Sequence, residues 1–81
     1  MKIEDWERIV YSPHKVEWKH TTGVRILLVK QGILYKLFLL DNKGATHFTI
    51  QDVNRSKLEA KSADWQRDYN KHLRKITLSS N

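Results

Sequence analysis

The chain has no cysteine and a single proline among its 81 residues. The absence of cysteine excludes disulfide bonds and thiolate metal ligands, so neither stabilises this short chain. A domain of this length buries only about 60% of the surface that its extended chain exposes. We therefore expect the stability to come from close packing of one core or from self-association, and a homodimer is among the expected states.

Long apolar runs are also missing. The longest apolar stretch, Ile33 to Leu40, spans eight residues and is interrupted by Lys36, whereas a membrane-spanning helix needs about 20. The N-terminal residues Lys2, Glu4 and Asp5 are charged, unlike the apolar centre of a secretory signal peptide. Together with the lack of cysteine, these features predict a cytoplasmic protein with no membrane partner.

Catalytic and metal-binding motifs are absent from the sequence. Its histidines show no HxH, HxxxH or HExxH spacing and no acidic cluster accompanies them: His14, His20, His47 and His72. No serine lies in a GxSxG context. We expect no metal, no cofactor and no enzymatic activity, although a metal-free ribonuclease remains compatible with the composition.

Positive charge is abundant. The chain carries 15 Lys and Arg against 9 Asp and Glu, a formal net charge of +6, and residues 55–81 hold seven basic and three acidic groups. This excess indicates a polyanion or an acidic protein surface as partner. The alternative is a basic surface that only maintains solubility.

The C-terminal third predicts one amphipathic helix from Ser56 to Leu78, capped by Asn54 or Ser56. Its apolar stripe recurs at helical spacing: Leu58, Trp65, Tyr69, Leu73 and Ile76. The opposite side is mostly basic and comprises Lys57, Arg67, Lys71, Arg74 and Lys75, with Asp64 and Asp68 among them. The apolar stripe must pack on another element, which leaves the basic side for solvent or a partner.

The middle of the chain predicts antiparallel strands. Val16 to His20 alternates apolar and polar residues, and Val24–Lys30 with Ile33–Leu40 forms a hairpin around Gln31-Gly32. The turn from Asp41 to Gly44 then leads into a strand in which Thr46, Phe48 and Ile50 alternate with polar residues. The order of these segments predicts a meander.

The N-terminal residues Ile3 to Val10 have apolar positions at helical spacing and predict a short helix that ends at Ser12-Pro13. The predicted fold is therefore a single α+β domain spanning residues 1–81. It has a three- or four-stranded antiparallel meander packed by a long C-terminal helix through Trp65 and Tyr69, with a short N-terminal helix.

Both faces of the predicted Ile33–Leu40 strand are apolar, and one helix covers only one face of a small sheet. We expect the N-terminal segment to cover the other face through Trp6, Ile9 and Val10. If that segment docks elsewhere, the exposed apolar patch marks a dimer or partner interface.

These features favour a small nucleic-acid-binding protein, architectural or regulatory, that contacts DNA or RNA. The predicted phosphate contacts are Arg67, Lys71, Arg74 and Lys75 of the helix, with Arg25 and Lys36 of the sheet. The candidates for base stacking are Tyr11, Trp18, Tyr35 and Phe48. The alternative is a protein-binding module, such as a small inhibitor or adaptor, that engages an acidic or apolar partner surface.

Overall fold

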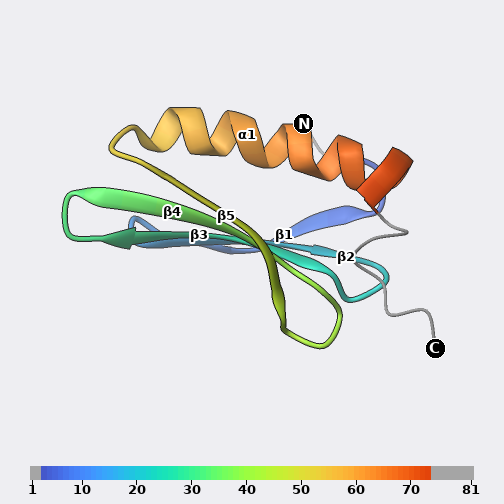
Figure 1. Ribbon diagram of the computed structural model, residues 1–81. Helices are drawn as coiled ribbons and strands as arrows, with labels where there is room; N and C mark the ends of the chain where they lie inside the picture. Colours follow the sequence, from blue (N-terminus) through green and yellow to red (C-terminus); the bar gives the residue numbers. More distant parts are fainter. Residues whose placement is uncertain (1–2, 74–81) are drawn as a thin grey trace.

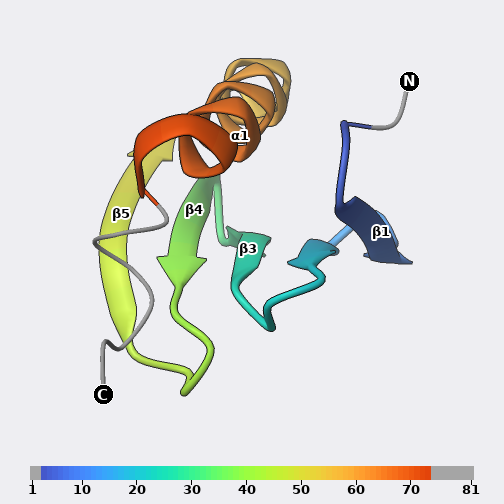
Figure 2. The same cartoon turned by 90° about the vertical axis from the view of Figure 1, so that its right-hand side faces the viewer.

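The computed structural model describes residues 3–73, which fold into a sheet layer and a helix layer (Figure 1). The strands form one antiparallel sheet in chain order: β1 (Trp6–Tyr11), β2 (Lys15–His20), β3 (Arg25–Gln31), β4 (Leu34–Leu40) and β5 (Thr46–Asp52). Helix α1 (Arg55–Asp68) lies over one face of this sheet and continues into a π-helical turn, η1 (Tyr69–Leu73). Figure 2 shows the same two layers end on. The α+β class and the meander are confirmed, but the sheet has five strands instead of three or four.

The predicted N-terminal helix is wrong, because these residues form the edge strand β1. Trp6 lies opposite His20 and Tyr11 lies opposite Val16, with a register shift between Arg8 and Val10. The residue within that irregularity, Ile9, is an extra residue that breaks the period-2 alternation of the strand. The apolar residues consequently fall at intervals that resemble those of a helix.

The predicted hairpin between β3 and β4 is confirmed, with its loop one residue further along the chain. Gln31 pairs with Leu34, so the loop residues are Gly32 and Ile33. Gly32 has a φ of +65°, the conformation that a type II′ turn requires at its first central position.

Helix α1 begins at an N-cap, as predicted for Asn54. The Asn54 side chain accepts hydrogen bonds from the backbone N–H groups of Ser56 at 2.9 Å and Lys57 at 3.3 Å. The predicted helix from Ser56 to Leu78 is observed as α1 and η1 up to Leu73, and the predicted positions beyond Leu73 lie outside the described residues.

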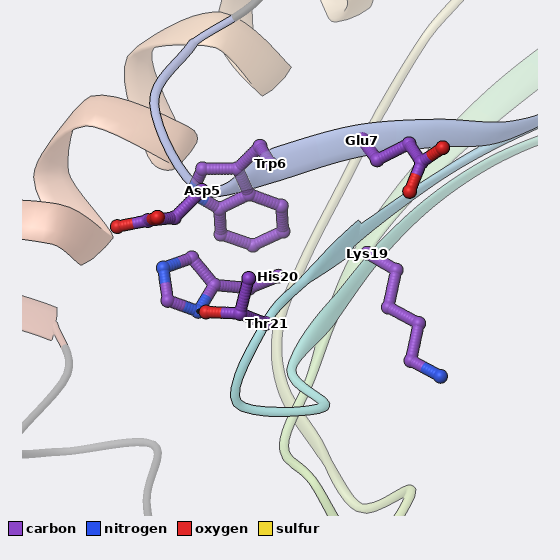
Figure 3. A pocket seen from close by; sticks show the side chains of 6 residues that line it. All are labelled: Asp5, Trp6, Glu7, Lys19, His20 and Thr21. Atoms are coloured by element: carbon purple, nitrogen blue, oxygen red, sulfur yellow. Dashed lines mark hydrogen bonds between the residues drawn. The ribbon is translucent and has the colours of Figure 1, made fainter.

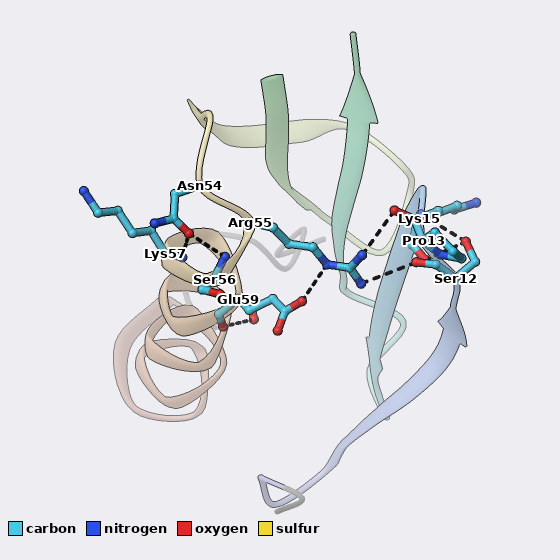
Figure 4. Close-up of polar contacts among 9 residues, drawn as sticks. Ser12, Pro13, Lys15, Asn54, Arg55, Ser56, Lys57 and Glu59 are labelled. Atoms are coloured by element: carbon cyan, nitrogen blue, oxygen red, sulfur yellow. Dashed lines mark hydrogen bonds and ion pairs between the residues drawn. The ribbon is translucent and has the colours of Figure 1, made fainter. Parts of the chain in front are cut away.

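Arg55 joins the start of α1 to the turn between β1 and β2 (Figure 4). Its guanidinium donates to the carbonyl oxygens of Pro13 at 3.1 Å and Ser12 at 3.4 Å, and to Glu59 Oε2 at 2.7 Å. These bonds fix one end of the helix over the sheet.

The core lies between α1 and the sheet, and the predicted contacts of Leu58, Trp65 and Tyr69 are confirmed because all three side chains are buried in it. Trp6 enters the same core and donates from Nε1 to the carbonyl oxygen of Gln66 at 3.1 Å. The remaining buried apolar residues are Val24, just before β3, and five residues of the strands: Val16, Ile26, Leu28, Leu37 and Leu39.

A cluster of aromatic rings closes one end of this core. The rings of Trp6, His20 and Tyr69 meet edge to face, with centroids 4.7 to 5.5 Å apart. The Thr22 backbone N–H donates to His20 Nδ1 at 3.1 Å, so Nε2 carries the proton and donates to Asn70 Oδ1 at 3.2 Å. The cluster therefore fastens η1 to β2 and the turn that follows it.

Candidate interaction surfaces

The sheet face opposite α1 carries a second layer of apolar side chains. Register places Val10, Leu27 and Phe38 on this face, since each alternates with residues that point into the core. None of them packs against the core cluster. We call this surface the open face; its half-buried apolar residues are Val10, Leu27, Val29, Leu34, Phe38 and Leu40.

No element within residues 3–73 covers the open face, as Figures 1 and 2 show. The prediction that the N-terminal segment covers it is wrong. Trp6 points into the core on the helix side, and Ile9 remains 46% exposed at the edge of the sheet. Pairing with β2 supplies hydrogen bonds for the backbone of the N-terminal segment. Because this segment is now a strand of the sheet, it does not lie across either face.

A buried carboxylate lies within the open face. Glu17 has a side chain only 7% exposed, and its oxygens lie 3.1 Å from Arg25 Nη1 and 3.6 Å from Lys15 Nζ. Register places it between Val10 and Leu27 on neighbouring strands. A buried charge needs such partners, because desolvation otherwise makes its ionised form costly.

The remaining charges give the open face an excess of positive charge. Lys19 and Lys36 alternate with core-facing residues and so belong to this face, together with the Lys15 and Arg25 that neutralise Glu17. One acidic side chain at the β1 edge, Glu7, pairs in register with Lys19 and offsets part of this charge. The open face thus combines apolar side chains with an excess of positive charge, and Lys36 lies between Leu34 and Phe38.

The predicted nucleic-acid contacts do not lie on one surface. Arg25 and Lys36 belong to the open face, whereas Arg67 of α1 and Lys71 of η1 are exposed on the helix layer. The helix layer and the sheet layer separate the two pairs. The other predicted contacts, Arg74 and Lys75, lie outside the described residues.

Two of these cations already have carboxylate partners. Arg67 Nη1 lies 3.4 Å from Asp64 Oδ1 on the helix surface, and Arg25 bonds Glu17. An exposed pair such as Arg67–Asp64 contributes roughly 0.2–0.5 kcal/mol, so a phosphate would replace it easily. Arg25 is held more firmly because its partner is buried.

The predicted stacking residues lie on the helix-side face of the sheet, opposite Arg25 and Lys36. Register aligns Trp18 with Ile26, Tyr35 with Lys30, and Phe48 with Leu39. Tyr11 is 62% exposed, and the Arg8 guanidinium lies 4.2 Å from its ring centroid. Among the described residues, Phe38 is therefore the one aromatic ring on the open face, whereas single-stranded nucleic acid stacks successive bases on several rings beside its phosphate contacts.

A groove runs between β5 and α1. It encloses about 320 Å³, and its lining residues are Phe48, Thr49, Ile50, Lys61, Trp65 and Asp68. Phe48 and Trp65 form its apolar floor, with ring centroids 6.1 Å apart. Sequence reasoning missed this site, because Phe48 and Trp65 each match the pattern of a core residue and nothing local shows that β5 is an edge strand.

A second cavity of about 420 Å³ lies at the end of β1 and β2, lined by Asp5, Trp6, Glu7, Lys19, His20 and Thr21. Figure 3 shows the Trp6 and His20 rings next to each other at this site, while the Lys19 side chain points away from them. Both ring nitrogens of His20 bond to protein groups. The histidine thus serves to hold η1 against the sheet.

Within residues 3–73, no helix combines the length and apolar character needed to cross a membrane. Comparisons of the chain with protein-family models, with curated proteins and with solved structures find no match.

Proposed function

We propose that the protein is a protein-binding module that uses the open face of its sheet. The observation that carries this proposal is the layer of half-buried apolar side chains opposite the core, which no described element covers. Apolar surface grouped on one face of a small domain is typical of an interaction site. The charged side chains on the same face then select among partners that have a matching apolar surface.

The partner that fits this face is a protein with an apolar patch that also carries carboxylates. Apolar side chains such as Leu27 and Phe38 supply the area that loses water on binding. Lys19 and Lys36 on the same face favour acidic side chains on the partner. Glu17 does not oppose them, since Lys15 and Arg25 already neutralise its charge.

A direct test uses the apolar anion 8-anilinonaphthalene-1-sulfonate as a probe of the open face. We expect it to bind the folded protein and to shift the NMR signals of Leu27, Phe38 and their neighbours on that face. Phe38→Asp should reduce its affinity roughly thirtyfold, as expected for loss of an aromatic anchor. Ile33→Asp is the matched control, because Ile33 is 82% exposed in the β3–β4 loop.

The natural partner is then identified with a photoreactive amino acid at position 27, with position 60 on the exposed side of α1 as control. The purified partner should bind the wild-type protein and Ile33→Asp equally, and Phe38→Asp at least roughly tenfold more weakly. Probe shifts confined to other surfaces, or a partner that binds Phe38→Asp as tightly as wild type, would refute the proposal.

Nucleic-acid binding is the second candidate function, favoured by the net charge of +6. Exposed cations on the helix layer support it, in particular Arg67 of α1 and Lys71 of η1. Two observations weigh against a combined phosphate and base contact. The described phosphate contacts are divided between two opposite surfaces, and the stacking candidates Trp18, Tyr35 and Phe48 lie on the helix-side face of the sheet, away from Arg25 and Lys36. Protein binding is therefore the first proposal.

A further inference from the structure

Strand β5 leaves one side of its backbone unpaired within the described residues. It is the last strand of the sheet and pairs only with β4. Exposed edge strands template pairing with another strand, and proteins often protect them with lysine or proline. From Phe48 to Asp52 the strand has neither residue, and its one charged side chain is Asp52. A register shift near Thr46 protects only the other end of the strand.

The groove beside β5 is arranged almost symmetrically about its centre. Thr49 lies between Phe48 and Ile50 on the strand, and Trp65 lies between Lys61 and Asp68 on the helix. On β5, the two residues beside Thr49 are both apolar. On α1, the two groove residues on either side of Trp65 carry opposite charges. A second chain related to the first by a two-fold axis would therefore place an apolar residue opposite each apolar residue of β5, and an opposite charge opposite each charge of α1.

We propose that the occupant of the groove is a second copy of this chain, paired through antiparallel β5 strands about a two-fold axis at Thr49. Each Phe48 then lies opposite the partner's Ile50, and the two Thr49 residues lie opposite each other. The pairing extends both sheets into one continuous sheet and satisfies the exposed backbone groups of both edges. Dimers with this symmetry use the same patch twice, which the groove allows.

The helices complete the interface. Because α1 and its copy run antiparallel on the same side of the joined sheet, Lys61 of each helix faces the partner's Asp68. With α1 over β4, the two helix axes lie roughly three strand spacings apart, about 14 Å. Directly packed helices are about 8–10 Å apart, so the aromatic groove side chains of both copies fill the space between them.

Charge favours a second copy over an unrelated extended peptide. An extended peptide could also form the backbone hydrogen bonds and occupy the groove. Only a symmetric copy necessarily carries an acidic residue opposite Lys61 and a basic residue opposite Asp68. The open face stays accessible in this dimer, so this proposal does not depend on the proposed function.

Sedimentation velocity of the full chain over a range of concentrations tests the proposal. We expect a reversible dimer with twice the mass of one chain. Thr49→Lys should weaken it roughly tenfold or more, since two lysines then face each other at the axis. Ala60→Lys adds the same charge on an exposed helix position outside the groove and should leave the dimer unchanged.

A charge exchange tests the predicted helix contact. Lys61→Glu alone and Asp68→Lys alone should each weaken the dimer roughly tenfold, because each variant places like charges opposite one another in both symmetric pairs. The double variant should restore wild-type association, since it restores opposite charges. Leu27→Lys on the open face should have no effect.

Three results would overturn the proposal. The first is a monomer at every concentration, and the second is a dimer indifferent to Thr49→Lys. The third is failure of the double charge exchange to restore association. A monomer whose β5 signals shift on addition of an extended peptide would assign the groove to a peptide instead.

Discussion

Tyr69 has no exposed surface and connects the helix layer to the sheet through one polar contact. Its hydroxyl lies 2.8 Å from Thr22 Oγ1 in the turn after β2. Its ring packs edge to face against Trp6 and His20. The side chain therefore combines a large apolar contact with one buried hydrogen bond.

Replacing Tyr69 with phenylalanine separates these two contributions. We expect Tyr69→Phe to lower the free energy of unfolding by about 0.5–1.5 kcal/mol, the net value of one such hydrogen bond. Tyr69→Ala should cost roughly 3–5 kcal/mol, because it also removes the buried ring. Urea denaturation followed by tryptophan fluorescence measures both. Equal losses in the two variants would show that the ring itself contributes little.

At the scale of elements, the turn between β4 and β5 depends on one carboxylate. Asp41 Oδ1 accepts the backbone N–H groups of Ala45 at 2.9 Å and Lys43 at 2.8 Å, and Oδ2 contacts His47 Nε2 at 3.1 Å. The hydrogen bond from Ala45 is the main cause that lowers the pKa of Asp41 below its ordinary value of 3.8; those from Lys43 and His47 add to it.

This lowered pKa predicts a pH dependence. The ionised carboxylate binds the turn more strongly than its protonated form, so its contribution is complete above pH 3.8. The contribution disappears as the pH falls through the lower pKa of the folded state. Asp41→Asn should therefore be less stable than wild type at neutral pH and equally stable at the acidic end of a urea titration. A constant difference across all pH values would contradict this role.

Strand β1 shows where local pattern fails to identify an element. The intervals from Ile3 to Val10 match a helix, but Ile9 lies at a strand irregularity and Trp6 belongs to the core. Pairing with β2 decides the conformation, because a helix of this length is marginal without packing. The β3–β4 hairpin and the Asn54 cap were predictable, since each depends on neighbouring residues.

At the scale of the molecule, the cations form two separate surfaces on either side of a two-layer structure. Arg67 of α1 and Lys71 of η1 are exposed on the helix layer, whereas Lys19 and Lys36 lie on the open face. A single duplex is rigid and would contact one surface at a time. The charges of the two surfaces should therefore act independently in any binding to nucleic acid.

This separation predicts how binding to a DNA duplex responds to salt. Affinity should fall with the logarithm of salt concentration by about 0.9 per phosphate neutralised. Two double variants are compared: Arg67→Glu with Lys71→Glu, and Lys19→Glu with Lys36→Glu. One of them should reduce that slope, and the other should leave it unchanged. Fluorescence anisotropy with a labelled duplex measures the slope. Equal reductions by both pairs would contradict the two-surface arrangement.

Local periodicity and capping were enough to predict the α+β class, the strands from Val16 onward, a helix start at Asn54 or Ser56, and the burial of Trp65 and Tyr69. Contacts between distant parts of the chain decide which strands form the edges and that the N-terminal segment joins the sheet. They also place Arg25 beside Glu17 on the open face and Arg67 on the helix layer. The same contacts decide that one apolar face stays uncovered and that Phe48 and Trp65 border a groove. These properties depend on the order of the strands and on the side of the sheet that the helix covers. Both are set by contacts between residues that are distant in sequence.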